Sequence, residues 1–266
     1  MEHDEILLRE RRGHVGTLLF NRPEKRNSLS VELLISLYDA LQEWADDPAI
    51  RVVVFTGAGD KAFSSGFDVL SIPTQMTPET EELLRKGNPV EMALTSVKNF
   101  PCPTIAMLNG YAFGAGCNLA INCDIRVGAD DIRMGMPPAK IGLVYHPEGL
   151  KQFVDVLGMA GTREIFFTGR SYSGAQLKDM GFVDYLVPRS ELHRTTYSLA
   201  EEIAANAPLS LRGTKKILTM LGRSWPLSEE NLKEAERIIK ESFNSKDMKE
   251  GQTAFLEKRI PQFKGH

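Results

Sequence analysis

Short hydrophobic runs and longer helical repeats alternate along the chain. Residues 14–20 form a β-rich run that ends in a turn signal, and residues 31–44 repeat apolar positions at helical spacing after Ser30, a favourable N-cap. Residues 51–57 and 104–110 are two further apolar runs, and both end in glycine. Strands that alternate with helices predict an α/β fold with a layered core.

The other segments depart from this pattern. Residues 71–99 are polar and contain three prolines, which predicts a partly helical excursion over the surface that covers a ligand. From Ala160 onward the pattern is helical, with glycines as stops, and residues 228–263 predict one long charged amphipathic helix. We expect this C-terminal region to pack against the core or against a partner chain.

Composition narrows the class of protein. A chain of 266 residues allows one large domain, or a core with a small appendage. Its 32 Lys and Arg against 35 Asp and Glu give a net charge of −3, which argues against a nucleic-acid partner and against an anionic membrane surface. There is no apolar leader and no membrane-spanning apolar run, and the three cysteines lack metal-site spacing. We therefore expect a cytoplasmic protein with reduced thiols, no metal and no membrane partner.

Two glycine-rich turns carry the first chemical signal. Residues 62–68 and 109–119 each follow an apolar strand, and the second leads into a predicted helix. Glycine permits a positive φ and a close approach of ligand, and a helix start presents unpaired N–H groups at the positive end of the dipole. The pair of turns predicts a site that stabilises an anionic oxygen.

Five segments, in this order along the chain, resemble the enoyl-CoA hydratase/isomerase family, also called the crotonase superfamily. They are residues 21–29, 62–68, 103–117, 123–126 and 254–259. The resemblance implies a crotonase-type spiral of ββα units with a helical C-terminal trimerisation region. It implies a core over residues 1–200 that holds the acyl-CoA site, and a helical oligomerisation region over residues 201–266. The implied protein is a homotrimer or hexamer that binds an acyl-CoA thioester and needs no cofactor beyond the coenzyme A moiety of the substrate.

The resemblance also implies the site residues. The family stabilises a thioester enolate with two main-chain N–H groups, which here belong to Phe67 and Ala115. Any residue except proline supplies such a donor. Lys215 is a further candidate for coenzyme A phosphates, with a solvated surface role as its alternative. The implied substrate-binding residues are Ala62, Ser64, Gly66, Asp68, Gly114, Pro138, Lys61 and Lys258.

The catalytic acids of ordinary hydratases are missing. Family members that hydrate enoyl-CoA carry two glutamates, and matching the motifs places Asn118 and Pro138 at those positions. Neither side chain exchanges a proton at neutral pH. The nearby Tyr145 matches a tyrosine that lies near the substrate carboxylate in methylmalonyl-CoA decarboxylase. His146 matches a functional aspartate of dienoyl-CoA isomerase and chlorobenzoyl-CoA dehalogenase.

Charge favours decarboxylation of a malonyl-type acyl-CoA, because a site without glutamates does not repel the substrate carboxylate. Asn118 and Tyr145 would orient that carboxylate, and His146 would return a proton. The chain departs from the decarboxylase pattern at Phe67, because that pattern has a histidine at the position directly before Asp68. The alternatives are isomerisation or atypical hydration through His146 or Glu148.

Structural interpretations remain open for the same side chains. His146 is then a helix cap, Tyr145 a core aromatic and Glu148 a first-turn helix acid. An alternative of another class is a non-catalytic scaffold that binds acyl-CoA or associates with RNA.

Overall fold

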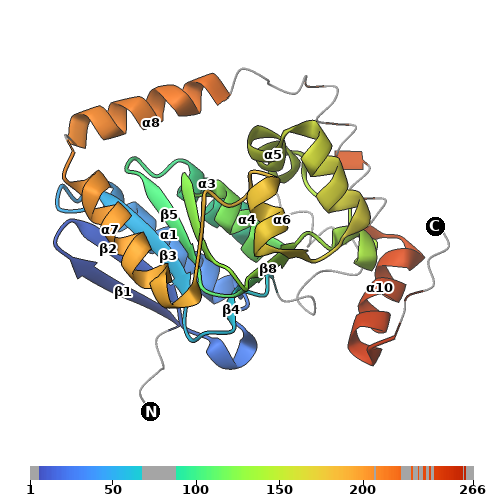
Figure 1. Ribbon diagram of the computed structural model, residues 1–266. Helices are drawn as coiled ribbons and strands as arrows, with labels where there is room; N and C mark the ends of the chain where they lie inside the picture. Colours follow the sequence, from blue (N-terminus) through green and yellow to red (C-terminus); the bar gives the residue numbers. More distant parts are fainter. Residues whose placement is uncertain are drawn as a thin grey trace, which may run out of the picture.

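The computed structural model describes residues 6–67, 88–206, 208–222, 243–259 and 261, together with the single positions 229, 233, 236, 237 and 240. Two β-sheets form its centre (Figure 1). The larger sheet contains, in spatial order, β1 (Leu7–Arg12), β2 (Val15–Phe20), β3 (Val52–Gly57), β5 (Thr104–Leu108), β7 (Ile125–Ala129) and β10 (Tyr185–Val187). The smaller sheet contains β4 (Ala62–Ser64), β6 (Tyr111–Phe113), β8 (Arg133–Gly135) and β9 (Tyr172–Ser173).

The strand order reveals a repeated unit. Strands β3, β5 and β7 lie side by side and parallel in the larger sheet, and the strands that follow them, β4, β6 and β8, lie side by side and parallel in the smaller one. Each unit therefore contributes one strand to each sheet before the chain enters a helix. This arrangement confirms the predicted α/β class and the spiral of ββα units.

Helices cover the sheets, and short 3-10 helices connect them. Within the described residues, the α-helices are α1 (Val31–Ala45), α3 (Pro89–Lys98), α4 (Ala115–Asn122), α5 (Pro147–Thr168), α6 (Gly174–Asp179), α7 (Leu192–Ala204), α8 (Pro208–Gly222) and α10 (Lys246–Glu257). The 3-10 helices are η1 (Pro23–Lys25), η3 (Pro138–Ile141) and η4 (Arg189–Glu191). The predicted boundary between residues 200 and 201 falls inside α7. Within the described ranges, no helix is both long and apolar enough to cross a membrane.

The local predictions for the first half of the chain are confirmed. The Ser30 side chain caps α1 by accepting a hydrogen bond from the Leu33 N–H at 3.3 Å. The apolar stripe of this helix is buried, from Leu33 through Leu41 to Trp44. The predicted strands appear as β2, β3 and β5, which are shorter than the apolar runs by one to two residues at their ends.

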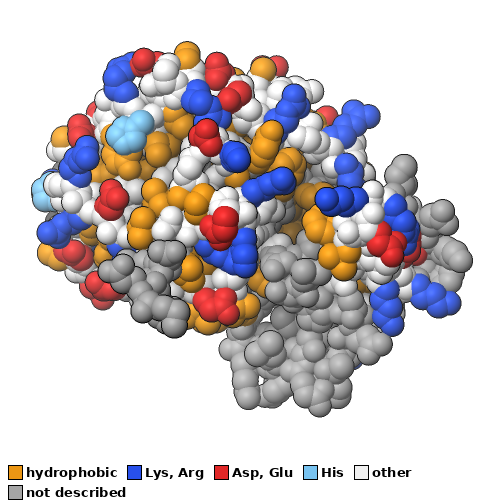
Figure 2. All heavy atoms as spheres, turned by 90° about the horizontal axis from the view of Figure 1, so that it is seen from below, with side chains coloured by type: hydrophobic (Ala, Val, Ile, Leu, Met, Phe, Trp, Pro, Cys, Tyr) orange, Lys and Arg blue, Asp and Glu red, His pale blue; other side chains and the backbone are white. Residues whose placement is uncertain are grey.

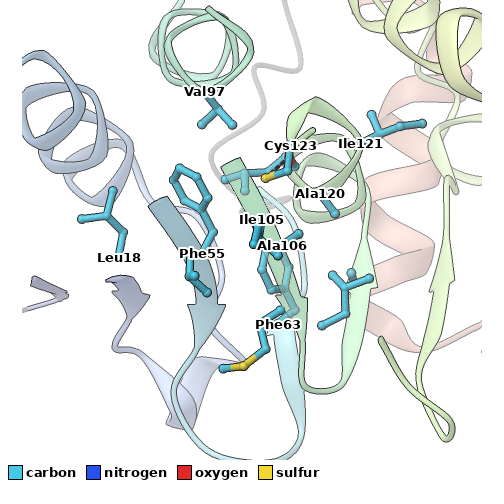
Figure 3. Packing of buried hydrophobic residues seen from close by; sticks show 14 of the residues in the cluster. Leu18, Phe55, Phe63, Val97, Ile105, Ala106, Ala120, Ile121 and Cys123 are labelled. Atoms are coloured by element: carbon cyan, nitrogen blue, oxygen red, sulfur yellow. Dashed lines mark hydrogen bonds between the residues drawn. The ribbon is translucent and has the colours of Figure 1, made fainter. Parts of the chain in front are cut away.

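The core lies between the sheets and the helices above them. Figure 3 shows Phe55 of β3, Phe63 of β4 and Val97 of α3 among its side chains. Phe20 and Phe63 meet edge to face, with ring centroids 5.5 Å apart, and so connect the larger sheet to the smaller one. This contact fixes the position of β4, whose C-terminal end carries the first glycine-rich turn.

The prediction of one long helix over residues 228–263 is wrong. The chain turns at Asn244 and Ser245, and the Ser245 side chain caps a new helix, α10, by accepting from the Met248 N–H at 3.0 Å. Helix α10 ends at Lys258, whose φ is +53°. Figure 1 shows α8 across the top of the molecule and α10 at the opposite, lower right side. The prediction failed because the helical spacing of apolar residues continues past Ser245, although this serine caps a separate helix.

Two further elements differ from the sequence predictions. Helix α5 begins at Pro147, before the predicted start at Ala160, and runs through a kink at Gly158 (φ +66°, ψ 176°). Strand β1 has no counterpart among the predictions, because most of its residues are exposed and polar and it pairs only with β2 at the edge of the sheet. Of the predicted excursion over residues 71–99, the part within the described residues contains α3, capped by Asn88.

Candidate active site

The two glycine-rich turns touch each other. Their strands, β4 and β6, are parallel neighbours, so both turns leave the same edge of the smaller sheet. A Cβ atom on Gly116 would lie 2.6 Å from the Ser64 main-chain oxygen, and one on Gly66 would lie 3.3 Å from the Ala115 nitrogen. Glycine is therefore required for this approach. We call residues 64–67 and 113–116 the oxyanion loops.

The oxyanion loops carry the two predicted donors. Ala115 is the first residue of α4, so its N–H lies at the positive end of the helix dipole. Phe67 follows Gly66, which has a φ of +95°. Within the part of the chain that the structure describes, neither N–H donates a hydrogen bond. Among the described residues, none lies within 4 Å of a Cβ atom built on Gly114, so these residues leave space beside the start of α4.

The segment 21–29 supports the first oxyanion loop. Asn27 is fully buried with a φ of +53°, and its Nδ2 donates to the main-chain oxygens of Ala58 (3.0 Å) and Ala62 (2.7 Å). The Leu29 N–H donates to the Gly66 oxygen at 2.9 Å. Asn27 is a site-supporting residue that the sequence analysis missed. An asparagine directly before the serine of this motif is the local signal, because Asn tolerates a left-handed backbone and bonds to main-chain groups.

Asn118 and Tyr145 meet one helical turn behind the Ala115 donor. The Asn118 side chain is buried in α4, and the Tyr145 hydroxyl donates to its Oδ1 at 2.6 Å. The Tyr145 ring packs on Phe166 at 5.3 Å between centroids, and a Cβ atom on Gly149 would lie only 2.4 Å from that ring. Burial raises the pKa of Tyr145 above its ordinary value, so the hydroxyl stays protonated at physiological pH. The pair forms a neutral polar site.

His146 and Glu148 lie at the exposed start of α5. His146 is the N-cap residue, and its Nδ1 accepts from the Glu148 N–H at 3.4 Å. This is the capping role that the sequence left open for His146, and it requires an unprotonated Nδ1, so the neutral ring carries its proton on Nε2. Glu148 is an exposed acid in the first turn of the helix. Proton transfer by either residue remains a prediction.

With this geometry in place, comparison with known proteins identifies the family. The family model described as enoyl-CoA hydratase/isomerase matches residues 10–266. The chain belongs to the enoyl-CoA hydratase/isomerase family. One curated relative, (E)-benzylidenesuccinyl-CoA hydratase from Thauera aromatica, is 33% identical over 252 residues, which cover 95% of this chain and 96% of the relative.

Two solved structures are similar to this chain in fold. Methylmalonyl-CoA decarboxylase in complex with 2-nitronate-propionyl-CoA superposes with a TM-score of 0.92 at 26% identity, and the match covers 98% of this chain and 99% of that one. Enoyl-CoA hydratase from Bacillus anthracis superposes with a TM-score of 0.76 at 29% identity, covering 98% and 100%. Family membership makes this chain an acyl-CoA enzyme of the crotonase type.

The predicted substrate-binding residues of this family member fall into three environments. The side chains of Ala62, Ser64 and Pro138 are buried, so any contact with substrate would use their main-chain atoms. Lys61 is exposed before β4, and Lys258 is exposed at the end of α10. Gly66 and Gly114 belong to the oxyanion loops, which are the third environment, and Asp68 lies outside the described residues.

Lys215 does not lie at the surface as a coenzyme A ligand would. Its Nζ lies 2.5 Å from Asp124 Oδ2 and donates to the Cys102 main-chain oxygen at 2.9 Å. The side chain is buried where α8 meets the start of β5. Its charge is therefore already paired inside the chain, and the suggestion that it contacts coenzyme A phosphates is wrong.

The thiols beside the site are buried and neutral. Burial raises the pKa of Cys117, in α4, and raises that of Cys123 to about 12. Among the described residues, no group of three or more His, Cys, Asp or Glu side chains is placed to hold a metal ion. The polar groups that the structure describes at the candidate site are main-chain donors, amides, a tyrosine, a histidine and the Glu148 carboxylate.

Proposed function

We propose that this chain decarboxylates a malonyl-type acyl-CoA. The observation that carries the proposal is the neutral pair of Asn118 and Tyr145 beside the oxyanion loops. A second carboxylate on the substrate meets no negative charge from this pair, whereas a glutamate at position 118 would repel it at close range.

The chemistry needs little from the protein beyond orientation and charge stabilisation. The bond between the α-carbon and the carboxylate breaks, CO2 leaves, and the electron pair moves onto the thioester to form an enolate. The N–H groups of Phe67 and Ala115 would stabilise the enolate oxygen. A proton then reaches the α-carbon either from solvent or from a doubly protonated His146 ring, which becomes neutral as it gives the proton up and which does not accept the capping hydrogen bond while both ring nitrogens are protonated. The product is the shortened acyl-CoA.

The comparisons support this substrate class from two directions. The methylmalonyl-CoA decarboxylase structure superposes better than the Bacillus anthracis hydratase, although its sequence identity is lower. The names of that decarboxylase and of the Thauera aromatica hydratase both denote a coenzyme A thioester that carries a second carboxylate. The substrates named for these two proteins therefore share this second carboxylate.

Hydration or isomerisation is the second candidate, and the name of the Thauera aromatica relative favours it. In that case, His146 or Glu148 acts as the base that activates water or removes a substrate proton. Both side chains are exposed at the start of α5 and so open to solvent. A scaffold that binds RNA is disfavoured by the net charge of −3. On the one face shown in Figure 2, basic and acidic side chains are interspersed.

Mass spectrometry of acyl-CoA substrates in deuterated water tests the proposal. The panel contains methylmalonyl-, ethylmalonyl-, crotonyl-, 3-enoyl- and cyclic dienoyl-CoA. Loss of CO2 with one deuterium retained at the α-carbon is the expected result. Gain of water, or deuterium exchange without other change, would replace decarboxylation by the second candidate. No turnover by a protein that still binds coenzyme A would favour the scaffold.

A pair of tyrosine variants controls this experiment. Tyr145→Phe removes the hydroxyl at the candidate site, whereas Tyr197→Phe removes a hydroxyl that is hydrogen-bonded to Thr17 at 2.8 Å, between α7 and β2. We expect Tyr145→Phe to lower turnover about tenfold or more and Tyr197→Phe to leave it nearly unchanged. Equal effects would mean that the Tyr145 hydroxyl has only a structural role.

The active form is a homotrimer or hexamer. Ile217 and Leu218 of α8, and Phe255 and Leu256 of α10, are more than half exposed, which is unusual for paired large apolar residues. Light scattering after size exclusion tests the assembly. A monomeric mass for the full chain at micromolar concentration would exclude this part of the proposal.

A further inference from the structure

A buried set of amide side chains lies behind Tyr145. Asn118 Nδ2 donates to Gln152 Oε1 at 2.6 Å, and Asn122 Nδ2 donates to the same Oε1 at 2.7 Å. Asn122 Nδ2 also donates to the Asn118 main-chain oxygen at 2.8 Å. All three side chains are at least nine-tenths buried. We call Asn118, Asn122, Gln152 and Tyr145 the amide network. Asn118 and Asn122 lie in α4, Gln152 lies in α5, and Tyr145 lies two residues before α5.

One main-chain carbonyl determines the orientation of the whole network. A carbonyl oxygen can only accept, so the Asn122 atom that faces it must be Nδ2. The same Nδ2 faces Gln152, which must therefore present its oxygen. The same oxygen lies 2.6 Å from the Asn118 amide and can only accept, so Asn118 must turn its own Nδ2 toward Gln152. Asn118 Oδ1 is then left for Tyr145, whose hydroxyl must donate.

A strained feature of the network supports this order. Asn122 Oδ1 is buried and has no hydrogen-bond partner among the described residues. Turning the Asn122 amide over would place this oxygen against two acceptor oxygens instead. The unpaired atom is thus a consequence of holding Gln152 in its observed orientation.

We infer that Gln152 and Asn122 are positioning residues that require a neutral amide at position 118 and fix the direction of the Tyr145 hydroxyl. A carboxylate at position 118 would bring an acceptor-only oxygen within about 2.6 Å of Gln152 Oε1, which Asn122 prevents from turning away. The network therefore excludes a carboxylate from the position where hydratase relatives are expected to carry a glutamate. The catalytic consequence rests on the proposed function, because it concerns repulsion of a substrate carboxylate.

A double-mutant cycle tests the structural part without any substrate. Asn118→Asp is expected to lower the free energy of unfolding, because two oxygens then face each other. In an Asn122→Leu background the same substitution is expected to cost less, because Gln152 can turn and donate its Nε2 to the new carboxylate. Urea unfolding at pH 7 measures both. Additive effects of the two substitutions would overturn the inference.

Two variants of Gln152 test the positioning role on the enzyme. Gln152→Glu keeps an acceptor for both amide donors, whereas Gln152→Met has similar volume and no acceptor. We expect Gln152→Met to lower kcat about tenfold or more. We expect Gln152→Glu to keep kcat within about threefold and to raise KM, because its charge opposes the substrate carboxylate. A kcat that is equally retained, or equally lost, in both variants would contradict the positioning role.

The two experiments separate the inference from the proposed function. If the acyl-CoA panel shows hydration instead of CO2 loss, the proposed function fails, while the unfolding cycle still decides whether Asn122 and Gln152 select an amide at position 118. If decarboxylation is observed and the cycle is additive, the inference fails alone. The Gln152 variants are then measured on whichever substrate turns over.

Discussion

The oxyanion loops and the amide network meet in helix α4 but are built from different atoms. The loops present main-chain N–H groups and use glycines at their close approaches, so under the proposed function the side chains of Phe67 and Ala115 contribute little. The network relies on which side-chain atom is an oxygen and which is a nitrogen, from Asn118 through Gln152 to Asn122. Under the proposed function, we therefore expect the first region to tolerate changes of residue type that the second does not.

The largest effect is expected from Gly116→Val, which tests the main-chain side of the comparison. The new Cβ would lie 2.6 Å from the Ser64 main-chain oxygen, so the two loops must separate. Loss of one aligned oxyanion donor lowers kcat by about 10²- to 10³-fold. Phe67→Leu is the matched control, because it keeps the N–H. Steady-state kinetics that show a larger loss for Phe67→Leu than for Gly116→Val would reverse the comparison.

Tyr145→Phe tests the side-chain region through stability. Removing the hydroxyl leaves the buried Asn118 Oδ1 without its donor, and we expect the free energy of unfolding to fall by about 1–3 kcal/mol. Urea titration measures this loss, provided that the dependence of the unfolding free energy on urea concentration is the same as in the wild type. An unchanged midpoint would show that water or another group replaces the hydroxyl at no cost.

The buried thiol of Cys117 lies in α4 between the two regions and gives a pH-dependent test. Burial raises its pKa in the folded protein above the ordinary thiol value of 9.0, and raises that of Cys123 to about 12. The unfolded chain therefore loses these protons first, so stability is fully present below pH 9 and falls as pH rises above it. Each thiol contributes a fall of about 1.4 kcal/mol per pH unit in that range. Between pH 8 and 11, the free energy of unfolding should fall less steeply with pH in Cys117→Ala than in the wild type. An unchanged pH dependence would contradict the burial of the Cys117 thiol.

The smallest stability effect is expected from His146→Ala. Loss of the helix cap costs about 0.5–2 kcal/mol, and His146→Asn, which restores a capping side chain, should recover most of it. Turnover of the acyl-CoA substrate by the two variants then separates capping from proton transfer. If His146 only caps α5, the asparagine variant regains wild-type turnover; if it returns the proton, turnover stays low despite restored stability.

Much of the fold followed from local patterns. The strands β2, β3 and β5, helix α1 with its Ser30 cap, and the two glycine-rich turns were predicted, because hydrophobic period and capping chemistry are encoded by neighbouring residues. Strand β1 was missed because an edge strand with an exposed face lacks a clear apolar alternation. The break at Ser245 was missed because a capping serine inside a helical period can also be an ordinary surface residue.

The sequence by itself determined the family-like order of motifs, the glycines of the oxyanion loops and the absence of the hydratase glutamates at Asn118 and Pro138. Only the tertiary structure decided that Tyr145 donates to Asn118, that Lys215 is paired with Asp124, and that Gln152 and Asn122 orient the site. The physical reason is separation along the chain. A turn or a cap depends on residues a few positions apart, whereas the direction of a buried hydrogen bond depends on which distant atoms the folded chain brings within about 3 Å.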